Sequence, residues 1–177
     1  MTSVFILLCG EVGARAACLT ASSAWKNASF APQSTAFSAV FNAIPGGAKI
    51  DGVTGLSQGG ASDFTGLAAI VRFNNTGFID ARNGGAYAAD AAVPYTAGAS
   101  YRFRMAVDPA AHRYSVFVTP PGAAERALAT NYAFRSERAS VSTLNNWAMS
   151  STAGSHQVCD FAVAPLADTV PPTVTMT

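Results

Sequence analysis

Four short apolar segments follow one another between residues 67 and 119, and each ends in residues that favour a turn. They are LAAIVRF (67–73) before NNTG, FIDAR (78–82) before NGG, YRFRMAV (101–107) before DPA, and HRYSVFVT (112–119) before PPG. In the third segment apolar and arginine residues alternate, which is the period of a strand with one buried face. Gly, Asn and Pro are the residues that tight turns require. Consecutive short strands with no helical period between them predict an all-β fold, an antiparallel two-sheet β-sandwich or jelly roll.

The composition allows one such domain and excludes some partners. The chain has 177 residues, of which 50% are hydrophobic and only 12% are charged, with a net charge of +1. Without a run of Lys or Arg, nucleic acid is not expected as the main partner. The expected strands cover 36–43, 49–56, 66–73, 77–82, 100–107, 112–119, 125–129, 140–149 and 156–163.

Both ends of the sequence differ from this pattern. Residues 1–17 resemble an export signal, because an apolar run (4–10) precedes a small-x-small site at 14–16. That run is too short to span a bilayer, and it could instead be a first strand of the domain. The tail, 166–177, reads as a linker whose DTVPPTV segment resembles the lead-in to bacterial immunoglobulin-like modules, or as a disordered end. We therefore expect a domain over 18–165 in a secreted or cell-surface protein with further, covalently linked domains.

Two cysteines remain once the leader, which contains Cys9, is set aside. Cys18 and Cys159 lie near the two ends of the expected domain. An even pair in an exported chain favours a disulfide, and two free buried thiols are the alternative. No CxxC pair or Cys/His cluster is present, which argues against zinc.

Several segments together resemble a known family. These are GLAAIVRFNNTGFIDARNGGAY (66–87), VPYTAGASYRFRMAVDPAAHRYSVFVTPPG (93–122) and FRSERASVSTLNNW (134–147). They are similar to the laminin-G-like, concanavalin A-like jelly rolls of secreted bacterial proteins, over residues 18–163. The resemblance implies two packed antiparallel sheets, with ligands on the concave face or at the loop rim. It also implies adjacent terminal strands, which fits a bridge between Cys18 and Cys159. Such domains serve as sugar-binding modules, adhesion modules and enzymes.

Arginine and aromatic residues are the best candidates for a ligand site, and we expect them on one sheet face. Arginine binds acidic groups in bidentate fashion, and aromatic rings stack on sugars. A groove for a polysaccharide or cell-surface glycan is therefore predicted. The alternative is that the arginines pair with Asp80, Asp108 or Glu137 in a structural spacer without a ligand. The candidate residues are Arg72, Arg82, Asn83, Tyr87, Arg102, Arg104 and Trp147, with Tyr95 and Asn146 nearby.

Catalysis is the less favoured prediction. A retaining glycosidase needs two carboxylates about 5–5.5 Å apart, yet no E-x-D-x-x-E-like pattern exists. A polysaccharide lyase needs a base and a neutralising Arg or Asn, for which His112, Tyr114, Arg104 and Asn146 have suitable types. FRSER (134–138) resembles the R-x-E element of alginate-lyase jelly rolls, but the companion Q-I-H and Y-x-K-x-G motifs are absent. We expect a non-catalytic binding module, with a small lyase or hydrolase of acidic glycans as the alternative.

No cofactor is expected apart from a structural calcium ion. Asp51, Asp63 and Asp80, with Asn75, lie in or near loops and carry the oxygen ligands that calcium prefers. Their spacing is not diagnostic, and all could be turn formers. The two histidines, His112 and His156, are expected at the surface.

Overall fold

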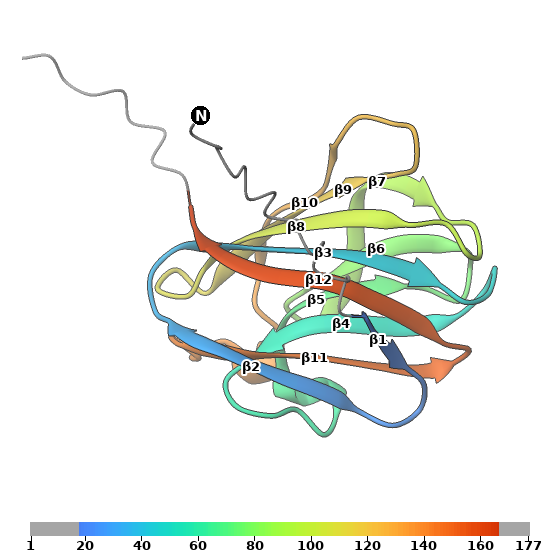
Figure 1. Cartoon of the computed structure of the whole chain (residues 1–177). Coiled ribbons are helices and arrows are strands. Elements are labelled where there is room, and N and C mark those ends of the chain that lie inside the picture. The colour runs from blue at the N-terminus through green and yellow to red at the C-terminus, as the bar shows by residue number, and fades with distance from the viewer. Residues whose placement is uncertain (1–17, 167–177) are drawn as a thin grey trace, which may run out of the picture.

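Two antiparallel six-stranded sheets pack face to face in the computed structural model, which describes residues 18–166 (Figure 1). The predicted leader (1–17) and all but the first residue of the predicted linker lie outside the described residues. Sheet A has the strand order β1-β12-β3-β8-β9-β10, and sheet B has the order β2-β11-β4-β5-β6-β7. The bounds are β1 Cys18–Ala21, β2 Lys26–Gln33, β3 Phe37–Pro45, β4 Asp51–Ser57, β5 Leu67–Phe73, β6 Phe78–Asn83, β7 Ala86–Pro94, β8 Tyr101–Asp108, β9 Arg113–Thr119, β10 Arg126–Ala133, β11 Leu144–Ala153 and β12 His156–Pro165. The predicted fold class, an antiparallel jelly-roll sandwich, is confirmed.

The core lies between the sheets and follows the period of two seen in the sequence. In β8, Phe103 and the residues two positions away on either side are buried, while Arg102 is exposed. Phe41 of β3 stacks on Phe103, with ring centroids 5.2 Å apart, and Phe73 of sheet B meets the same ring edge-on at 6.0 Å. Burial of each such side chain contributes about 1.5–3 kcal/mol. The alternation therefore decides which side chains hold the two sheets together.

The disulfide joins the two ends of the described chain. Cys18 of β1 lies opposite Cys159 of β12, with the Cα atoms 4.1 Å apart. The bridge spans 141 residues of sequence, and closing so long a loop contributes about 4–5 kcal/mol in the chain-entropy model. The predicted disulfide is confirmed.

The strands that the sequence pattern missed lie at the edges of the sheets. β1, β2 and β7 were not predicted, and β10 extends beyond the expected 125–129. These four strands are the outer members of the two sheets. An edge strand has one neighbour and buries few side chains, so β7 (AYAADAAVP) lacks the apolar alternation that marks β8. Among the central strands, β11 begins at Leu144 rather than at 140, because Ser136–Arg138 form a short 3-10 helix, η2.

His156 is a correction, because it lies inside the sandwich rather than at the surface. Its side chain belongs to sheet A and is 1% exposed. The ring makes hydrogen bonds with two hydroxyls of sheet B, at 3.0 Å from Thr54 Oγ1 and 2.9 Å from Ser151 Oγ. Burial lowers the pKa of His156 to about 4. A neutral imidazole therefore links the two sheets.

No helix among residues 18–166 combines the length and the apolar character needed to cross a membrane.

Candidate functional site

The candidate arginines lie on two opposite faces of the sandwich. Arg72 and Arg82 belong to β5 and β6 of sheet B, whereas Arg102 and Arg104 belong to β8 of sheet A. Each side chain points away from the core because its neighbours in the strand point into it. The prediction of one shared face is wrong, because the chain passes from sheet B to sheet A between β7 and β8.

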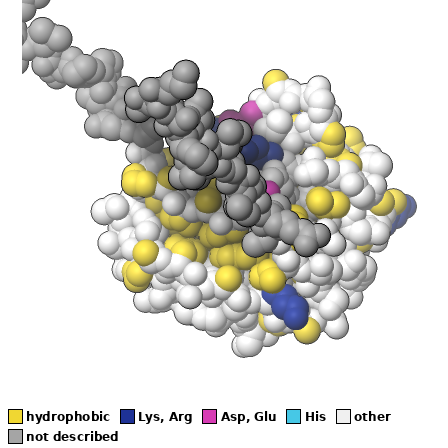
Figure 2. All heavy atoms as spheres, viewed as in Figure 1, with side chains coloured by type: hydrophobic (Ala, Val, Ile, Leu, Met, Phe, Trp, Pro, Cys, Tyr) yellow, Lys and Arg dark blue, Asp and Glu magenta, His cyan; other side chains and the backbone are white. Residues whose placement is uncertain are grey.

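On sheet A the arginine is paired and covers an aromatic ring. Arg104 Nε lies 3.1 Å from a carboxylate oxygen of Glu125, and its guanidinium lies 3.8 Å from the centre of the Phe117 ring. The hydrogen bond with Arg104 lowers the pKa of Glu125 below its usual value. In Figure 2, hydrophobic side chains form a broad patch on the described part of the surface, and Lys or Arg side chains appear at only a few places. Arg104 therefore covers one face of the Phe117 ring and is itself held by Glu125.

On sheet B an arginine and a tyrosine form a fixed pair. Arg72 binds Asp80 in bidentate fashion, with Nε–Oδ1 2.9 Å and Nη2–Oδ2 2.7 Å, and its Nη1 lies 3.6 Å from Asp51. The same guanidinium lies 3.6 Å from the centre of the Tyr87 ring. Tyr87 pairs with Arg82 across the strands, which brings the Arg82 guanidinium to 5.1 Å from the ring centre. Two arginines thus hold Tyr87 on the outer face of sheet B.

The turn between β6 and β7 sets this pairing. Gly84 has a φ of 54°, a left-handed conformation that favours glycine. The Asn83-Gly84-Gly85 turn can therefore reverse the chain tightly from β6 into β7. The side-chain oxygen of Asn83, a predicted ligand residue, accepts from the backbone N of Ala133 at 3.0 Å. Asn83 therefore ties the turn to β10.

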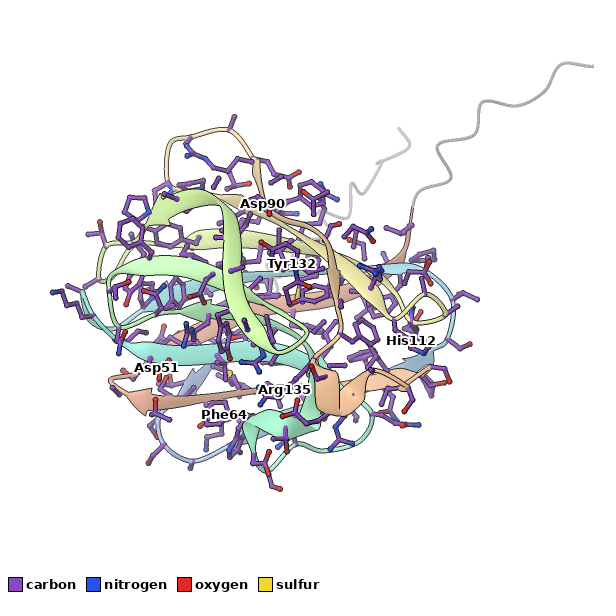
Figure 3. All side chains as sticks on the ribbon, turned by 180° about the vertical axis from the view of Figure 1, so that it is seen from behind. Asp51, Phe64, Asp90, His112, Tyr132 and Arg135 are labelled. Carbon is purple, nitrogen blue, oxygen red and sulfur yellow. A yellow bond between two sulfur atoms is a disulfide. The ribbon has the colours of Figure 1, made fainter. Side chains whose placement is uncertain are left out.

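An open pocket of about 250 Å³ lies beside Tyr87. Figure 3 shows Asp51, Phe64 and Arg135 around one part of the sheet B face. We call this hollow the Tyr87 pocket. It is lined by Asp51, Val53, Phe64, Arg72, Tyr87, Arg135 and Thr152.

One wall of the Tyr87 pocket comes from the β4–β5 connection, residues 58–66, which folds back over sheet B. Ala61 and Phe64 of this loop pack with the outward-facing side chains of Val53 and Ile70, apart from the main core. Asp63 caps the short helix η1 (Phe64–Gly66) by accepting from Thr65 N. The loop therefore has an apolar base of its own and holds Phe64 over the sheet.

Asn146 anchors the same loop. Its Nδ2 donates to Asn27 Oδ1 and to Ser57 Oγ, both at 2.9 Å. Asn27 in turn holds the backbone of Ala61. Its Oδ1 accepts from the Ala61 N at 2.8 Å, and its Nδ2 donates to the Ala61 carbonyl oxygen at 2.9 Å. Asn146 is 5% exposed. The Nδ2 group of Asn146 is therefore used in hydrogen bonds within the domain.

A second hollow, of about 420 Å³, is lined in part by Phe78 and Asp80. Asp80, paired with Arg72, adjoins this hollow, and Arg72 lines the Tyr87 pocket. Ala88 lies opposite Ala81 and Val93 opposite Ile79, so residues 89–92 bulge out of the edge strand. Phe78 is 41% exposed. We call this second site the Phe78 hollow.

The other proposed lyase residues do not converge. The Tyr114 hydroxyl lies in the core, 2.9 Å from the carbonyl oxygen of Ile70, and burial raises the pKa of Tyr114 above its usual value. His112 lies in the β8–β9 turn against Phe134, with ring centroids 6.2 Å apart. With Arg104 on sheet A and Asn146 on sheet B, these four residues do not bring a base and a neutralising group together.

Trp147 was predicted to bind ligand but is part of the core. It is 6% exposed and stacks on Phe161, with ring centroids 4.8 Å apart. Its side chain points between the sheets because Asn146, its neighbour in β11, points outward.

The calcium candidates each have protein partners. Asp80 accepts from Arg72 and from Asn74 Nδ2, the latter at 2.9 Å, and Asp51 accepts from Thr152 Oγ1 at 2.7 Å. Asp63 is used in capping η1. Over residues 18–166, no group of three or more His, Cys, Asp or Glu side chains could hold a metal ion. Calcium stays a prediction without support from this geometry.

Phe64, Phe78 and Arg135 were not predicted as site residues. The available signal was chemical: Phe64 and Phe78 are large aromatic residues beside polar turns, at SDFTG and NNTGF. Arg135 lies in FRSER, the segment that resembles the R-x-E element of alginate lyases. Nothing local indicates that these residues share a face with Tyr87.

No family model and no curated protein matches this sequence. Similar solved structures exist. A structure titled "Sialidase" has a TM-score of 0.53 at 10% identity, covering 85% of this chain and 15% of that one. The metal-free form of lectin I-B4 from Griffonia simplicifolia has a TM-score of 0.55 at 11% identity, covering 79% and 80%. A single mutant of Congerin II has a TM-score of 0.50 at 10% identity, covering 79% and 99%.

At these identities the likeness concerns the fold alone. The chain spans about 15% of the length of the sialidase. With the two six-stranded sheets described above, these neighbours establish that the chain has a jelly-roll β-sandwich fold.

Proposed function

We propose that this domain is a non-catalytic module that binds a polysaccharide on the outer face of sheet B. The observation that carries the proposal is the fixed Tyr87 ring, held by Arg72 at 3.6 Å beside an open pocket. A ring that is already ordered loses little conformational freedom when a ligand packs on it.

The chemistry of the two hollows fits a sugar chain. The Tyr87 pocket combines aromatic and aliphatic walls with a few polar groups, as ligand sites do. At about 250 Å³ it is smaller than the roughly 300–1,000 Å³ that encloses a drug-sized ligand, so it suits one residue of a chain. The Phe78 hollow adjoins the same Arg72–Asp80 pair and offers a second aromatic side chain. A polysaccharide lying across this pair would reach both hollows.

The comparisons support this reading of the fold. One similar structure is that of a protein named as a lectin. In the sialidase, a region of similar structure is a small part of a longer chain, which supports an accessory module. The Cys18–Cys159 disulfide supports a secreted or cell-surface location, because such bonds persist in oxidising compartments. The dispersed positions of His112, Tyr114, Arg104 and Asn146 support binding without cleavage.

A glycan array followed by titration of the bound polysaccharide tests the proposal. We expect Tyr87→Ala to weaken binding about tenfold, equivalent to about 1.4 kcal/mol, with thermal unfolding showing that the variant is folded. Phe117→Ala, the matched change under Arg104 on sheet A, should leave binding unchanged. An ultraviolet assay for unsaturated products should stay at baseline. Loss of binding in the Phe117 variant alone, or no binding to any glycan, would overturn the proposal.

A further inference from the structure

Three guanidinium groups lie near Tyr87: those of Arg72 and Arg135 line the Tyr87 pocket with it, and that of Arg82 adjoins its ring. Arg72 and Arg82 lie 3.6 and 5.1 Å from its ring centre, and Arg135 lines the same pocket. Burial raises the pKa of Tyr87, and the positive charges of Arg72, Arg82 and Arg135 act against this rise. The three arginines thus favour negative charge at the phenol oxygen, whereas burial and Asp80 oppose it.

The hydrogen-bond donors of these arginines are only partly used. Arg72 donates from Nε and Nη2 to Asp80, and its Nη1 lies 3.6 Å from Asp51 in an ion-pair contact. Arg82 donates from Nε to the carbonyl oxygen of Gly84 at 3.0 Å, and within residues 18–166 no acceptor is found for its two terminal nitrogens.

Arg135 is engaged on one side. Its Nη2 donates to Glu137 at 3.1 Å. Its Nε lies 3.0 Å from the other Glu137 oxygen, in an ion-pair contact too poorly aligned for a hydrogen bond. Neither Arg135 Nη1 nor the Tyr87 hydroxyl has a hydrogen-bond partner in the described part of the chain, so each is available to a ligand.

The acceptors near the pocket are already used. Asp80 accepts from Arg72 and Asn74, and Asp51 accepts from Thr152 and faces Arg72. Asp51, Asp80 and Glu137 accompany the three arginines, so a ligand meets free N–H donors rather than free acceptors. A neutral sugar would displace water from these donors without returning a charged acceptor, which weakens binding.

We propose that the Tyr87 pocket selects a sugar that carries a carboxylate, a uronate residue of a polysaccharide. The carboxylate accepts from the free donors of Arg135, Arg82 and Tyr87, and the sugar ring lies toward Phe64. A planar carboxylate matches the fork of a guanidinium and forms charge-assisted hydrogen bonds with it. This inference rests on the proposed function and specifies the ligand class of that same site.

The test compares uronate polymers with their neutral counterparts. Polygalacturonate, alginate and glucuronan are each titrated into the full chain, beside the same polymers after reduction of the carboxylates to alcohols. For at least one pair we expect the acidic form to bind ten times more tightly or better. Its affinity should fall when salt is raised, because the charges are partly exposed.

Variants localise the effect. Arg135→Gln should remove most of the preference for the acidic polymer, and Arg82→Gln provides a second test if the first variant unfolds at a lower temperature. Arg102→Gln makes the same charge change on sheet A and should leave the preference intact.

The outcomes separate the two proposals. Equal binding of acidic and reduced polymers overturns the uronate inference and leaves the binding module standing, as does binding of neutral array glycans alone. Tighter binding of sulfated polymers than of any uronate also overturns it, as do equal losses in the Arg102 and Arg135 variants. Failure to bind any glycan, acidic or neutral, overturns the proposed function itself.

Discussion

The two outer faces of the sandwich use the same residue types and reach different results. On sheet A, Arg104 covers Phe117 and pairs with Glu125, and both charged side chains are more than a third exposed. On sheet B, Arg72 stacks on Tyr87 and pairs with Asp80, whose side chain is 12% exposed. An exposed pair of the first kind contributes about 0–1 kcal/mol. The less exposed pair on sheet B fixes its aromatic partner more firmly.

The larger difference is the loop that sheet B carries. Residues 58–66 fold over its outer face on a small apolar cluster and raise Phe64 as a wall opposite Tyr87. A cation and an aromatic ring on a strand therefore do not make a site by themselves. The pocket exists because a connection between strands packs back onto the sheet.

The largest effect is expected from acid, because the neutral ring of His156 joins the two sheets behind these faces. Its folded pKa, about 4, is below the unfolded value of 6.5, so the unfolded state binds the proton more readily. The contribution of neutral His156 is complete above pH 6.5 and is lost as the pH falls toward 4, at a cost of about 3 kcal/mol. Urea unfolding between pH 7 and pH 4 should show this slope, and His156→Gln should flatten it. A slope unchanged by the substitution would contradict this role.

Removal of the loop anchor should affect only one face. Asn146→Ala removes two buried hydrogen bonds, those that Asn27 Oδ1 and Ser57 Oγ accept from Asn146 Nδ2, and should lower the free energy of unfolding by about 1–3 kcal/mol. Amide hydrogen exchange should then rise in residues 58–66. Asn42→Ala, which removes an exposed hydrogen bond to Asp160 on sheet A, should cost about 0.5 kcal/mol or less. Equal losses of unfolding free energy in the two variants would show that Asn146 stabilises the domain no more than an exposed hydrogen bond does.

The two ion pairs can be compared directly. Asp80→Asn leaves Arg72 partly buried without its main counter-charge and should cost about 2 kcal/mol, a value reduced for the remaining exposure. Glu125→Gln, the matched change on sheet A, should cost at most about 1 kcal/mol. Chemical denaturation of both variants measures the difference. A larger loss for Glu125→Gln would reverse the comparison.

The smallest effect concerns the length of the ligand. Phe78→Ala should weaken binding of a polysaccharide about fivefold, or about 1 kcal/mol, because the Phe78 hollow would lose its aromatic contact. Stability should hardly change, since Phe78 is 41% exposed. Binding of a single sugar unit should be unaffected by the substitution. Should the single unit weaken as much as the polymer, the two hollows would not be separate subsites.

Much of the fold was predictable from local pattern, and the failures have a common cause. The central strands β3 and β8 bury one face and therefore show it as alternation, with Phe103 and Arg102 on opposite sides. The edge strands β1, β2 and β7 bury less, so their sequences need not alternate. Trp147 and His156 were misplaced because a side chain's face depends on the register of its strand, and a shift of one residue reverses it.

For the candidate site, the sequence identified Arg72, Arg82 and Tyr87 by their chemistry and placed Arg102 and Arg104 with them. Phe64 and Arg135 were missed, although both line the Tyr87 pocket. Asn146 was a candidate only under the lyase alternative, and its role in holding the loop was not predicted because an outward amide on a strand gives no sign of the loop above it.

The residues alone decide which side chains of a clearly alternating strand such as β8 face the core and where the turns fall, because these follow from short-range sterics and burial. The residues alone do not decide which sheet a strand joins, since β7 and β8 are consecutive in sequence yet lie in opposite sheets. The Tyr87 pocket is different for the same reason, because it joins residues from Asp51 to Thr152. Both depend on pairing and packing between segments far apart in the chain, for which a local pattern carries no signal.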